Sequence, residues 1–352
     1  MRKKIYFFIG TTAELIKLSP VIRELEKRKI KFKIITSGQT DVNFAEVKDL
    51  IKKTNPDIVL PKKMNKSSVF LFLLWAFKTT FTSPFLLFRE LTRGNRSQTF
   101  FIVHGDTVTS LIGAVIARIF GLKTVHIESG LRSFNFLEPF PEEITRYLIS
   151  KIADIHFCPN KWSLNNLKTI GGKKINTFQN TFVESVRAQP TQKPKAGGKY
   201  FILILHRQEH VIFQREKSKD LINFVIRNSP KQVKCIFIKH ATTPEIPRLS
   251  GQVILFPRLP FGQYLALLKK AQFIVTDGGG NQEESYYLGL PCLLLRNRTE
   301  RTEGLGKNVV LSKEKKGIIK DFLENYRDYK REKIKLRLSP SKIIVDYLVS
   351  NK

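Results

Sequence analysis

Cysteine is scarce in this chain. Among 352 residues there are three cysteines, unclustered and set in apolar surroundings: Cys158, Cys235 and Cys292. This pattern excludes a disulfide framework and favours reduced core thiols in a cytoplasmic protein. A secretory signal is not expected either, because only five apolar residues, 5–9, stand between the first lysines and Gly10.

Acidic residues are too few to balance the basic ones. The chain has 61 Lys and Arg against 30 Asp and Glu, a formal net charge of +31. Such an excess favours anionic partners, of which nucleic acid, an anionic membrane face and a sugar nucleotide all qualify. Because the basic residues are spread over the chain, without a zinc-ligand pattern or a nucleic-acid-binding motif, nucleic acid is not the partner we expect.

Long uninterrupted apolar runs are also missing. The nearest is 69–88, which Lys78, several threonines and Pro84 interrupt. A transmembrane helix needs about 20 mostly apolar residues, so we do not expect this segment to span a bilayer. Two interpretations stay open: a buried helix of the first domain, or an amphipathic or re-entrant element at a bilayer surface. Basic residues near the segment favour the second: Lys62, Lys63, Lys66, Arg89, Arg93 and Arg96.

The rest of the chain alternates short β-branched runs with amphipathic stretches, which is typical of parallel sheets covered by helices. Strands are predicted at 5–9, 32–36, 57–60, 99–103, 124–127, 155–158, 200–205, 234–238, 253–256, 273–276 and 292–295. Helices are predicted at 13–27, 107–119 and 142–153. The Pro-, Gly- and Lys-rich stretch 185–199 indicates an exposed linker. We therefore expect two Rossmann-like α/β domains, 1–184 and 200–336, with a C-terminal helix within 337–352 that packs back on the first.

Three carboxylates follow predicted strands or begin a helix in the first half. Asp106 and Glu128 each come just after a strand, and Glu142 opens a helix. Asp is a common helix N-cap, so capping alone would explain any one of them. Because the carboxyl ends of parallel strands meet at one edge of a sheet, the trio together indicates a ligand site at that edge.

Two stretches of the second half also follow strands. His206 and Arg207 come after 200–205, where they suit acid–base work or phosphate binding, although a lone His is usually structural. The strand 273–276 leads into a glycine-rich turn and a helix, whose exposed N–H groups suit a diphosphate. Glu284 would lie one helical turn further on, where it could accept ribose hydroxyls. A merely flexible turn is the alternative for Gly278, Gly279 and Gly280.

These stretches resemble a known family. The motifs GTTAELIKLSP, VHGDTVTSL, HIESGLR, PFPEEITR, HRQEH, TDGGGNQEE and RTE match, in order and spacing, those of non-hydrolysing UDP-N-acetylglucosamine 2-epimerases of bacterial surface-polysaccharide pathways. The resemblance implies a GT-B fold, two Rossmann-like domains facing each other across a cleft. It also implies epimerisation at C2 of UDP-N-acetylglucosamine to UDP-N-acetylmannosamine, by elimination and re-addition of UDP.

The resemblance assigns roles to particular residues. Asp106, Glu128 and Glu142 correspond to the acid–base carboxylates, and His206 lies near the diphosphate. Substrate contacts are expected from Lys17, Arg132, Arg146, Arg207, Gly278, Gly279, Gly280, Glu284 and Arg301. No metal and no cofactor is expected. The expected partner is UDP-N-acetylglucosamine or a related UDP-sugar, while a homodimer and a peripheral location on an anionic inner membrane face stay open.

The chain departs from the family pattern at the nucleotide contacts. Thr12 stands where the family usually has a phosphate-binding Arg, and Gly278 stands where it usually has Ser. Gln39-Thr40 replaces the family's Gln-His pair, which puts allosteric activation by a second UDP-sugar in doubt. Other functions therefore stay open: a membrane-associated GT-B glycosyltransferase or epimerase acting on a polyprenyl-linked sugar, a hydrolysing epimerase, and a binding protein.

Overall fold

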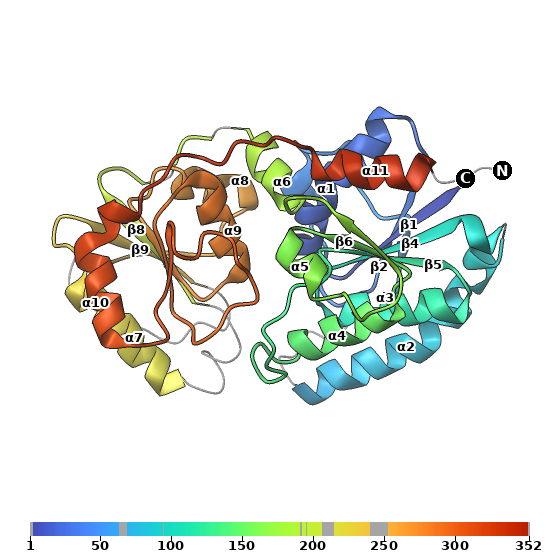
Figure 1. Ribbon diagram of the computed structural model, residues 1–352, viewed down its shortest axis with the longest axis horizontal. Coiled ribbons are helices and arrows are strands. Elements are labelled where there is room, and N and C mark those ends of the chain that lie inside the picture. Colours follow the sequence, from blue (N-terminus) through green and yellow to red (C-terminus); the bar gives the residue numbers. More distant parts are fainter. Residues whose placement is uncertain are drawn as a thin grey trace. The chain divides into compact units, whose positions relative to one another are not determined.

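The chain forms two compact α/β units, each described here by itself. The computed structural model describes residues 3–62, 69–93, 95–190, 192–194, 196–205, 215–239 and 253–350, without the side chains of Val69, Phe70 and Arg215. Unit 1 comprises Met1–Gln189 and Arg337–Lys352, and unit 2 comprises Pro190–Leu336. Both units consist of a parallel sheet flanked by helices (Figure 1).

Unit 1 contains a seven-stranded sheet in the order β3-β2-β1-β4-β5-β6-β7, in which every pairing is parallel. Its strands are β1 Lys4–Ile9, β2 Lys33–Thr36, β3 Ile58–Val59, β4 Thr99–His104, β5 Lys123–Ile127, β6 Ile155–Cys158 and β7 Lys173–Asn176. Its helices are α1 Thr12–Lys27, η1 Phe44–Val47, α2 Val69–Leu91, η2 Arg96–Gln98, α3 Val108–Ile119, α4 Glu142–Ile152, α5 Lys161–Asn165, α6 Phe182–Ala188 and α11 Pro340–Ser350.

The last helix, α11, completes unit 1 although it comes from the far end of the chain. Ile344, Val345 and Leu348 are fully buried. Polar contacts fix the helix at both ends, since Glu184 accepts the backbone N–H of Ser341 at 2.9 Å and Lys3 donates to carbonyls near the C-terminus. In Figure 1 it lies beside α1.

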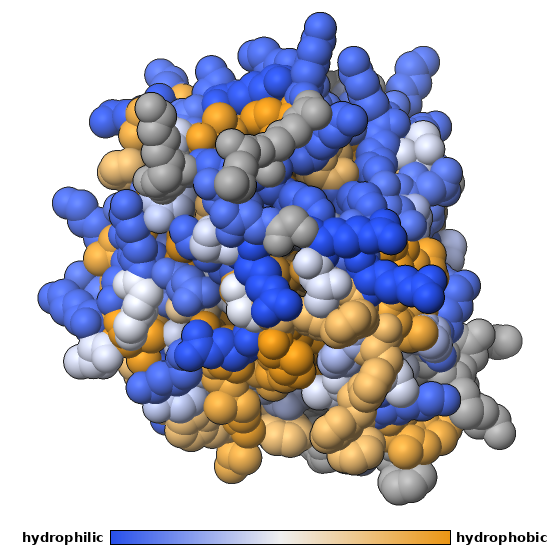
Figure 2. All heavy atoms as spheres, turned by 90° about the vertical axis from the view of Figure 1, so that its right-hand side faces the viewer, coloured by the Kyte–Doolittle hydropathy of each residue, from blue (hydrophilic) through white to orange (hydrophobic). Residues whose placement is uncertain are grey.

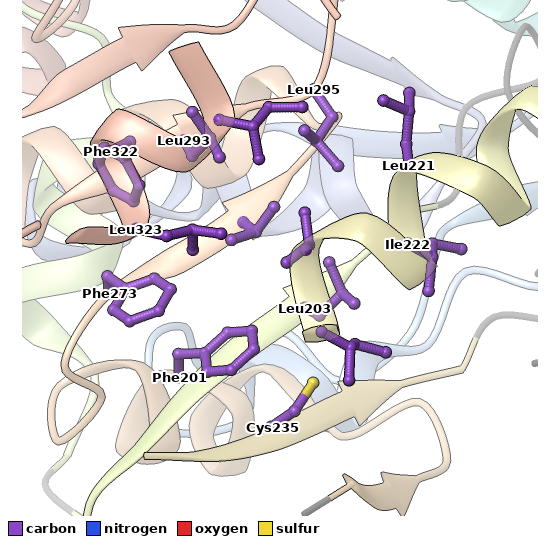
Figure 3. Close-up of a cluster of buried hydrophobic side chains, with 14 of the residues drawn as sticks. Phe201, Leu203, Leu221, Ile222, Cys235, Phe273, Leu293, Leu295, Phe322 and Leu323 are labelled. Carbon is purple, nitrogen blue, oxygen red and sulfur yellow. The ribbon is translucent and has the colours of Figure 1, made fainter. Parts of the chain in front are cut away.

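Unit 2 contains a six-stranded parallel sheet in the order β10-β9-β8-β11-β12-β13. Its strands are β8 Tyr200–Ile204, β9 Lys234–Ile238, β10 Val253–Phe256, β11 Ile274–Thr276, β12 Cys292–Leu294 and β13 Val309–Leu311. Its helices are α7 Arg215–Asn228, α8 Phe261–Leu268, α9 Gly279–Leu288, α10 Lys316–Asn325 and η4 Tyr326–Tyr329. The core between sheet and helices includes Phe201 and Phe273, whose rings stack with centroids 4.6 Å apart (Figure 3).

The prediction of two Rossmann-like α/β units is confirmed, with differences at the sheet edges. Strands β7 and β13 were not predicted. The sequence of β7, KKIN, has only one apolar residue, and β13, VVL, is only three residues long. Helix α6 reaches Ala188, so the first residues of the expected linker 185–199 are helical.

Helix α2 is continuous over 23 residues and includes Pro84, which interrupts the apolar run in the sequence. Trp75 before the proline and Leu87 and Leu91 after it are all buried in the core of unit 1, so packing holds both halves in one helix. Only 22% of the most apolar window of this helix is buried, so it is not a buried core helix.

Candidate functional site

Both sheets have the strand order of a doubly wound fold, which places a ligand crevice in each. The order reverses between β1 and β4 in unit 1 and between β8 and β11 in unit 2. At such a point, the connections that follow the two neighbouring strands run to opposite faces of the sheet. This leaves a crevice at the carboxyl edge of the sheet. The predicted site residues that the structure describes follow strands of these two sheets or lie on the helices between the strands.

A buried glutamate holds the turn after β1. Oε2 of Glu14 accepts the backbone N–H groups of Gly10 and Thr11 at 2.7 and 2.8 Å. Its other oxygen accepts the hydroxyl of Thr107, at the start of α3, at 2.6 Å. Burial raises the pKa of Glu14, and these hydrogen bonds oppose the rise. Glu14 therefore ties together the two turns that flank the crevice.

Two departures from the family pattern are explained by this turn. The hydroxyl of Thr12 accepts the backbone N–H of Asn43 at 2.9 Å, and the residue is 7% exposed. Thr40 donates its hydroxyl to the carbonyl of Gly10 at 2.8 Å. Both side chains thus stabilise loops of unit 1, in a region where the family usually has cationic side chains.

Asp106 directly follows the β4 turn and is paired with an arginine. The residue that caps α3 is Thr107, whose hydroxyl accepts the N–H of Ser110, so the interpretation of Asp106 as an N-cap is wrong. The carboxylate of Asp106 instead forms an ion pair with Arg146 of α4. His126 fixes the turn itself, because its Nε2 lies 2.7 Å from the carbonyl oxygen of Gly105.

Arg146 belongs to a buried chain of alternating charges. Its side chain is 2% exposed, and its guanidinium also contacts the fully buried carboxylate of Glu143 at 2.6 Å. The second oxygen of Glu143 pairs with Nε of Arg132 at 2.5 Å. Arg132 and Arg146 were predicted to bind substrate. In the structure both pair with carboxylates of unit 1, and Arg146 orients Asp106.

Glu128 follows β5 with a left-handed backbone, φ 65°, and its side chain is 2% exposed. Nζ of Lys17 lies 2.9 Å from its Oε2. The side-chain amide of Asn180 donates to the same oxygen, and Nε2 of His104 lies 3.8 Å away. Lys17, predicted to bind substrate, thus orients the Glu128 carboxylate.

Glu142 is the first residue of α4 and is half-buried. The hydroxyl of Thr145 is shared between the backbone carbonyls of Glu142 and Asp106, which places the start of α4 beside the β4 turn. A Cβ built on Gly105 would lie 3.5 Å from Oε1 of Glu128. The structure therefore places all three residues, Asp106, Glu128 and Glu142, at one edge of the unit 1 sheet.

Sequence reasoning missed the residues that hold this edge. Glu14 and Glu143 lie inside the quoted motifs but were not singled out, and Asn180 lies far from them in the sequence. The signal for Glu14 was present, because Thr11 and Glu14 have the spacing of a capping box and form one.

In unit 2, α9 begins at Gly279 with Gly278 as its N-cap, so two of the three glycines are helical rather than in a turn. A Cβ on Gly279 would lie 2.8 Å from Oε1 of Glu300, which explains the glycine. A Cβ on Gly280 would meet no atom within 4 Å. The first turn of α9 is therefore open at Gly280, where backbone N–H groups could bind an anion.

Glu284 and Arg301 have partners within unit 2. Oε2 of Glu284 accepts the hydroxyl of Tyr264 and the side-chain amide of Asn281, both at 3.0 Å. Arg301 is 4% exposed and contacts Glu283 at 2.8 Å, so it supports α9 from within. The predicted residues His206 and Arg207 lie outside the described residues. Within the described ranges, no group of three His, Cys, Asp or Glu could hold a metal ion.

Two buried histidines beneath the unit 1 site remain neutral at ordinary pH. Burial, and next the neighbouring His156, lowers the pKa of His126 to about 3. Burial lowers the pKa of His156 to about 4. His156 also contacts the hydroxyl of Ser129 at 3.0 Å, so both rings hold turns at the carboxyl edge of the sheet.

These pKa values predict that unit 1 loses stability in mild acid. Below about pH 6.5 the unfolded chain binds protons on both imidazoles while the folded protein does not, so stability falls as pH falls toward the folded values. Between pH 7 and 5 we expect a loss of about 2 kcal/mol for each histidine. Urea unfolding followed by tryptophan fluorescence measures it for unit 1, since both tryptophans, Trp75 and Trp162, lie there. The variant H126Q/H156Q should show a flatter dependence on pH; an unchanged slope would contradict the assignment.

Comparison with known proteins agrees with this arrangement. Residues 94–339 match the family described as UDP-N-acetylglucosamine 2-epimerase. The chain is 31% identical to the UDP-N-acetylglucosamine 2-epimerase of Methanocaldococcus jannaschii, covering 90% of each chain, and 33% identical to that of Methanococcus maripaludis, covering 87% of this chain and 86% of the relative. The solved structure of the M. jannaschii enzyme in complex with UDP-GlcNAc and UDP matches 99% of this chain and 100% of its own, with a TM-score of 0.84 and 26% identity. This chain therefore belongs to the UDP-N-acetylglucosamine 2-epimerase family.

Proposed function

We propose that this protein interconverts UDP-N-acetylglucosamine and UDP-N-acetylmannosamine by epimerisation at C2, and so supplies an activated sugar for surface polysaccharides. The observation that carries the proposal is the grouping of Asp106, Glu128 and Glu142 at the carboxyl edge of one sheet. Two of the carboxylates are oriented by cations, Arg146 and Lys17. Family membership supports the same reaction.

The reaction needs proton transfers at C2 on both faces of the sugar. A carboxylate removes the C2 proton while the bond from C1 to the UDP oxygen breaks, which gives a 2-acetamidoglucal and UDP. Another group then protonates C2 from the opposite face as the UDP oxygen attacks C1 again. The atoms balance without oxidation, and several carboxylates held in different orientations can provide acids and bases for the two faces. We assign these roles to Asp106, Glu128 and Glu142 as a group.

Unit 2 would bind the nucleotide in this proposal. The open first turn of α9 at Gly280 offers backbone N–H groups to the diphosphate. Glu284 would accept the ribose hydroxyls, and its bonds from Tyr264 and Asn281 hold it in place. Arg301 would act indirectly, by fixing Glu283 in the same helix. His206 and Arg207 would contribute near the diphosphate.

A deuterium-exchange experiment tests the reaction directly. Incubation of the protein with UDP-N-acetylglucosamine in deuterium oxide is expected to give both epimers with deuterium at C2, because the proton returned to C2 comes from a group that exchanges with solvent. Nuclear magnetic resonance of the sugar follows the label. Substrate that stays unlabelled and unepimerised after long incubation would overturn the proposal.

The same experiment separates the alternatives. A hydrolysing epimerase would accumulate UDP and free N-acetylmannosamine, whereas the proposed enzyme keeps the UDP-sugar total constant. A transferase or epimerase acting on a polyprenyl-linked sugar is not favoured, because relatives that match over most of this chain are named UDP-N-acetylglucosamine 2-epimerases.

A cytoplasmic location suits a sugar-nucleotide enzyme, and the three cysteines are free and buried, as in a reducing compartment.

A further inference from the structure

Helix α2 carries a stripe of exposed apolar side chains. The stripe consists of residues spaced three or four apart, which lie on one face of a helix. Their exposures are 50% for Leu74, 65% for Phe77, 59% for Phe81, 83% for Phe85 and 59% for Phe88. Figure 1 places α2 along the lower edge of unit 1, and Figure 2 shows apolar side chains gathered along that edge beneath a mostly hydrophilic surface.

The inward side of α2 carries polar residues beside the buried Trp75, Leu87 and Leu91. Thr79 and Ser83 are 5% and 1% exposed, and they face inward. Glu90, the one acidic residue of the helix, accepts the hydroxyl of Tyr6 and the ammonium of Lys33, both at 2.7 Å. A helix on the surface of a water-soluble domain normally exposes polar side chains to solvent, and contiguous exposed apolar patches mark interaction sites.

Positive charge surrounds the stripe. The exposed basic side chains Lys78, Arg89 and Arg93 lie on or just after α2, and Arg96 follows. At the carboxyl end of the helix, Lys4 donates to the carbonyl of Arg93. Beyond it lies an open pocket of about 680 Å³ at the amino ends of β1 and β2. Its lining includes three acidic residues, Glu26, Asp57 and Glu90, and twice as many lysines: Lys3, Lys4, Lys31, Lys33, Lys52 and Lys53. Exposed phenylalanines bordered by cations match the chemistry of an anionic bilayer surface.

We propose that α2 docks unit 1 onto an anionic membrane surface. The helix lies in the plane of the interface, with the stripe at the boundary between headgroups and acyl chains and the basic residues at lipid phosphates. By length and composition, Leu71–Leu91 could cross a membrane. Spanning would, however, pull Trp75, Leu87 and Leu91 out of the core and break the contacts of Glu90. The docking does not depend on the proposed reaction.

A second copy of the chain is a poorer match for the same surface. Two identical stripes in contact would bring Lys78, Arg89 and Arg93 of each copy close to those of the other. Each copy also has a net charge of +31, so long-range repulsion opposes the approach. An anionic bilayer removes this repulsion and turns the same charges into an attraction.

Vesicle flotation with the full-length protein tests the proposal. Vesicles of phosphatidylcholine with about 30% phosphatidylserine are expected to carry the protein upward at low salt, and pure phosphatidylcholine vesicles much less. The variant F81E/F85E should lower the partition coefficient at least about tenfold, because it removes two exposed rings and adds negative charge. The variant K78Q/R89Q/R93Q should lose the preference for phosphatidylserine.

Phe178→Glu is the matched control, because it makes the same change at a phenylalanine of unit 1 that is 54% exposed and outside α2. It should bind vesicles as the unchanged protein does. Circular dichroism and epimerase activity in vesicle-free solution report whether F81E/F85E is folded. The proposal is overturned if the protein ignores phosphatidylserine vesicles, or if folded F81E/F85E binds them as well as the unchanged protein. It is also overturned if the unchanged protein sediments as a dimer that F81E/F85E abolishes, because α2 would then bind a second copy.

Discussion

Glu128→Gln is expected to reduce kcat for epimerisation by a factor of about 10²–10⁴, the usual contribution of a general acid or base. Glutamine keeps the size of the side chain but cannot exchange a proton with C2 of the sugar. Lys17 and Asn180 would still surround it, so the architecture of the site should persist. The rate of deuterium entry at C2, measured beside kcat, should fall in parallel, since both depend on the same proton transfers.

The control for this variant is Glu24→Gln. Glu24 is also an ion-paired glutamate of unit 1, bound to Arg28 at 2.8 Å, but it lies on α1 away from the carboxyl edge of the sheet. We expect its kcat to stay within about twofold of the unchanged protein, because the Glu24–Arg28 pair has no contact with Asp106, Glu128 or Glu142 among the interactions described. Calorimetric titration with UDP separates binding from chemistry. A folded Glu128→Gln protein with nearly unchanged kcat would exclude Glu128 from the proton transfers.

Arg146→Met is expected to lower the free energy of unfolding of unit 1 by about 3–5 kcal/mol. The guanidinium lies between Asp106 and Glu143, of which Glu143 is fully buried. Removing it leaves two carboxylates without their shared cation. Urea unfolding followed by tryptophan fluorescence reports on unit 1, where both tryptophans lie.

Two further variants make this result specific. Arg28→Met removes an arginine that is 29% exposed and paired with Glu24 and Asp346, and it should cost no more than about 1 kcal/mol. Arg146→Lys keeps the charge but not the two-armed geometry, so it should fall between the other two. Equal effects of Arg146→Met and Arg28→Met would show that the buried charges do not act together.

The fold could be predicted from the sequence wherever strands are central. The runs at 5–9, 99–103 and 234–238 are continuous and apolar because both faces of a central parallel strand are covered. Of the edge strands, β3 and β10 were predicted. Strand β7, with one apolar residue in KKIN, and β13, with only three residues, were missed. Pro84 interrupts the apolar run of α2 without ending the helix, because Trp75 before it and Leu87 and Leu91 after it pack into the core of unit 1.

The positions of the three acidic site residues could be predicted from the sequence, but the side chains that pair with them could not. Asp106, Glu128 and Glu142 follow strand ends or begin a helix, so topology alone brings them together. Their cations are a different case: Lys17 and Arg146 were expected to contact substrate, and the structure pairs them with Glu128 and with Asp106. The partner of a buried charged side chain depends on which groups are close in three dimensions, which the sequence does not state. Asn180 is a further example, because its side-chain amide donates to Glu128 although the two residues are 52 positions apart.

The position of α11 has a consequence for biosynthesis. Unit 1 begins with the first residues made, yet Ile344, Val345 and Leu348, which complete its packing, come after the whole of Pro190–Leu336. At a translation rate of about 5–20 residues per second, that intervening stretch takes roughly 7–30 s to make. During this interval unit 1 lacks a helix, and the groups that contact α11, among them Glu184 and Arg28, face solvent. The unit that starts first is therefore finished last, and a chain that ends before residue 337 lacks the helix that completes unit 1.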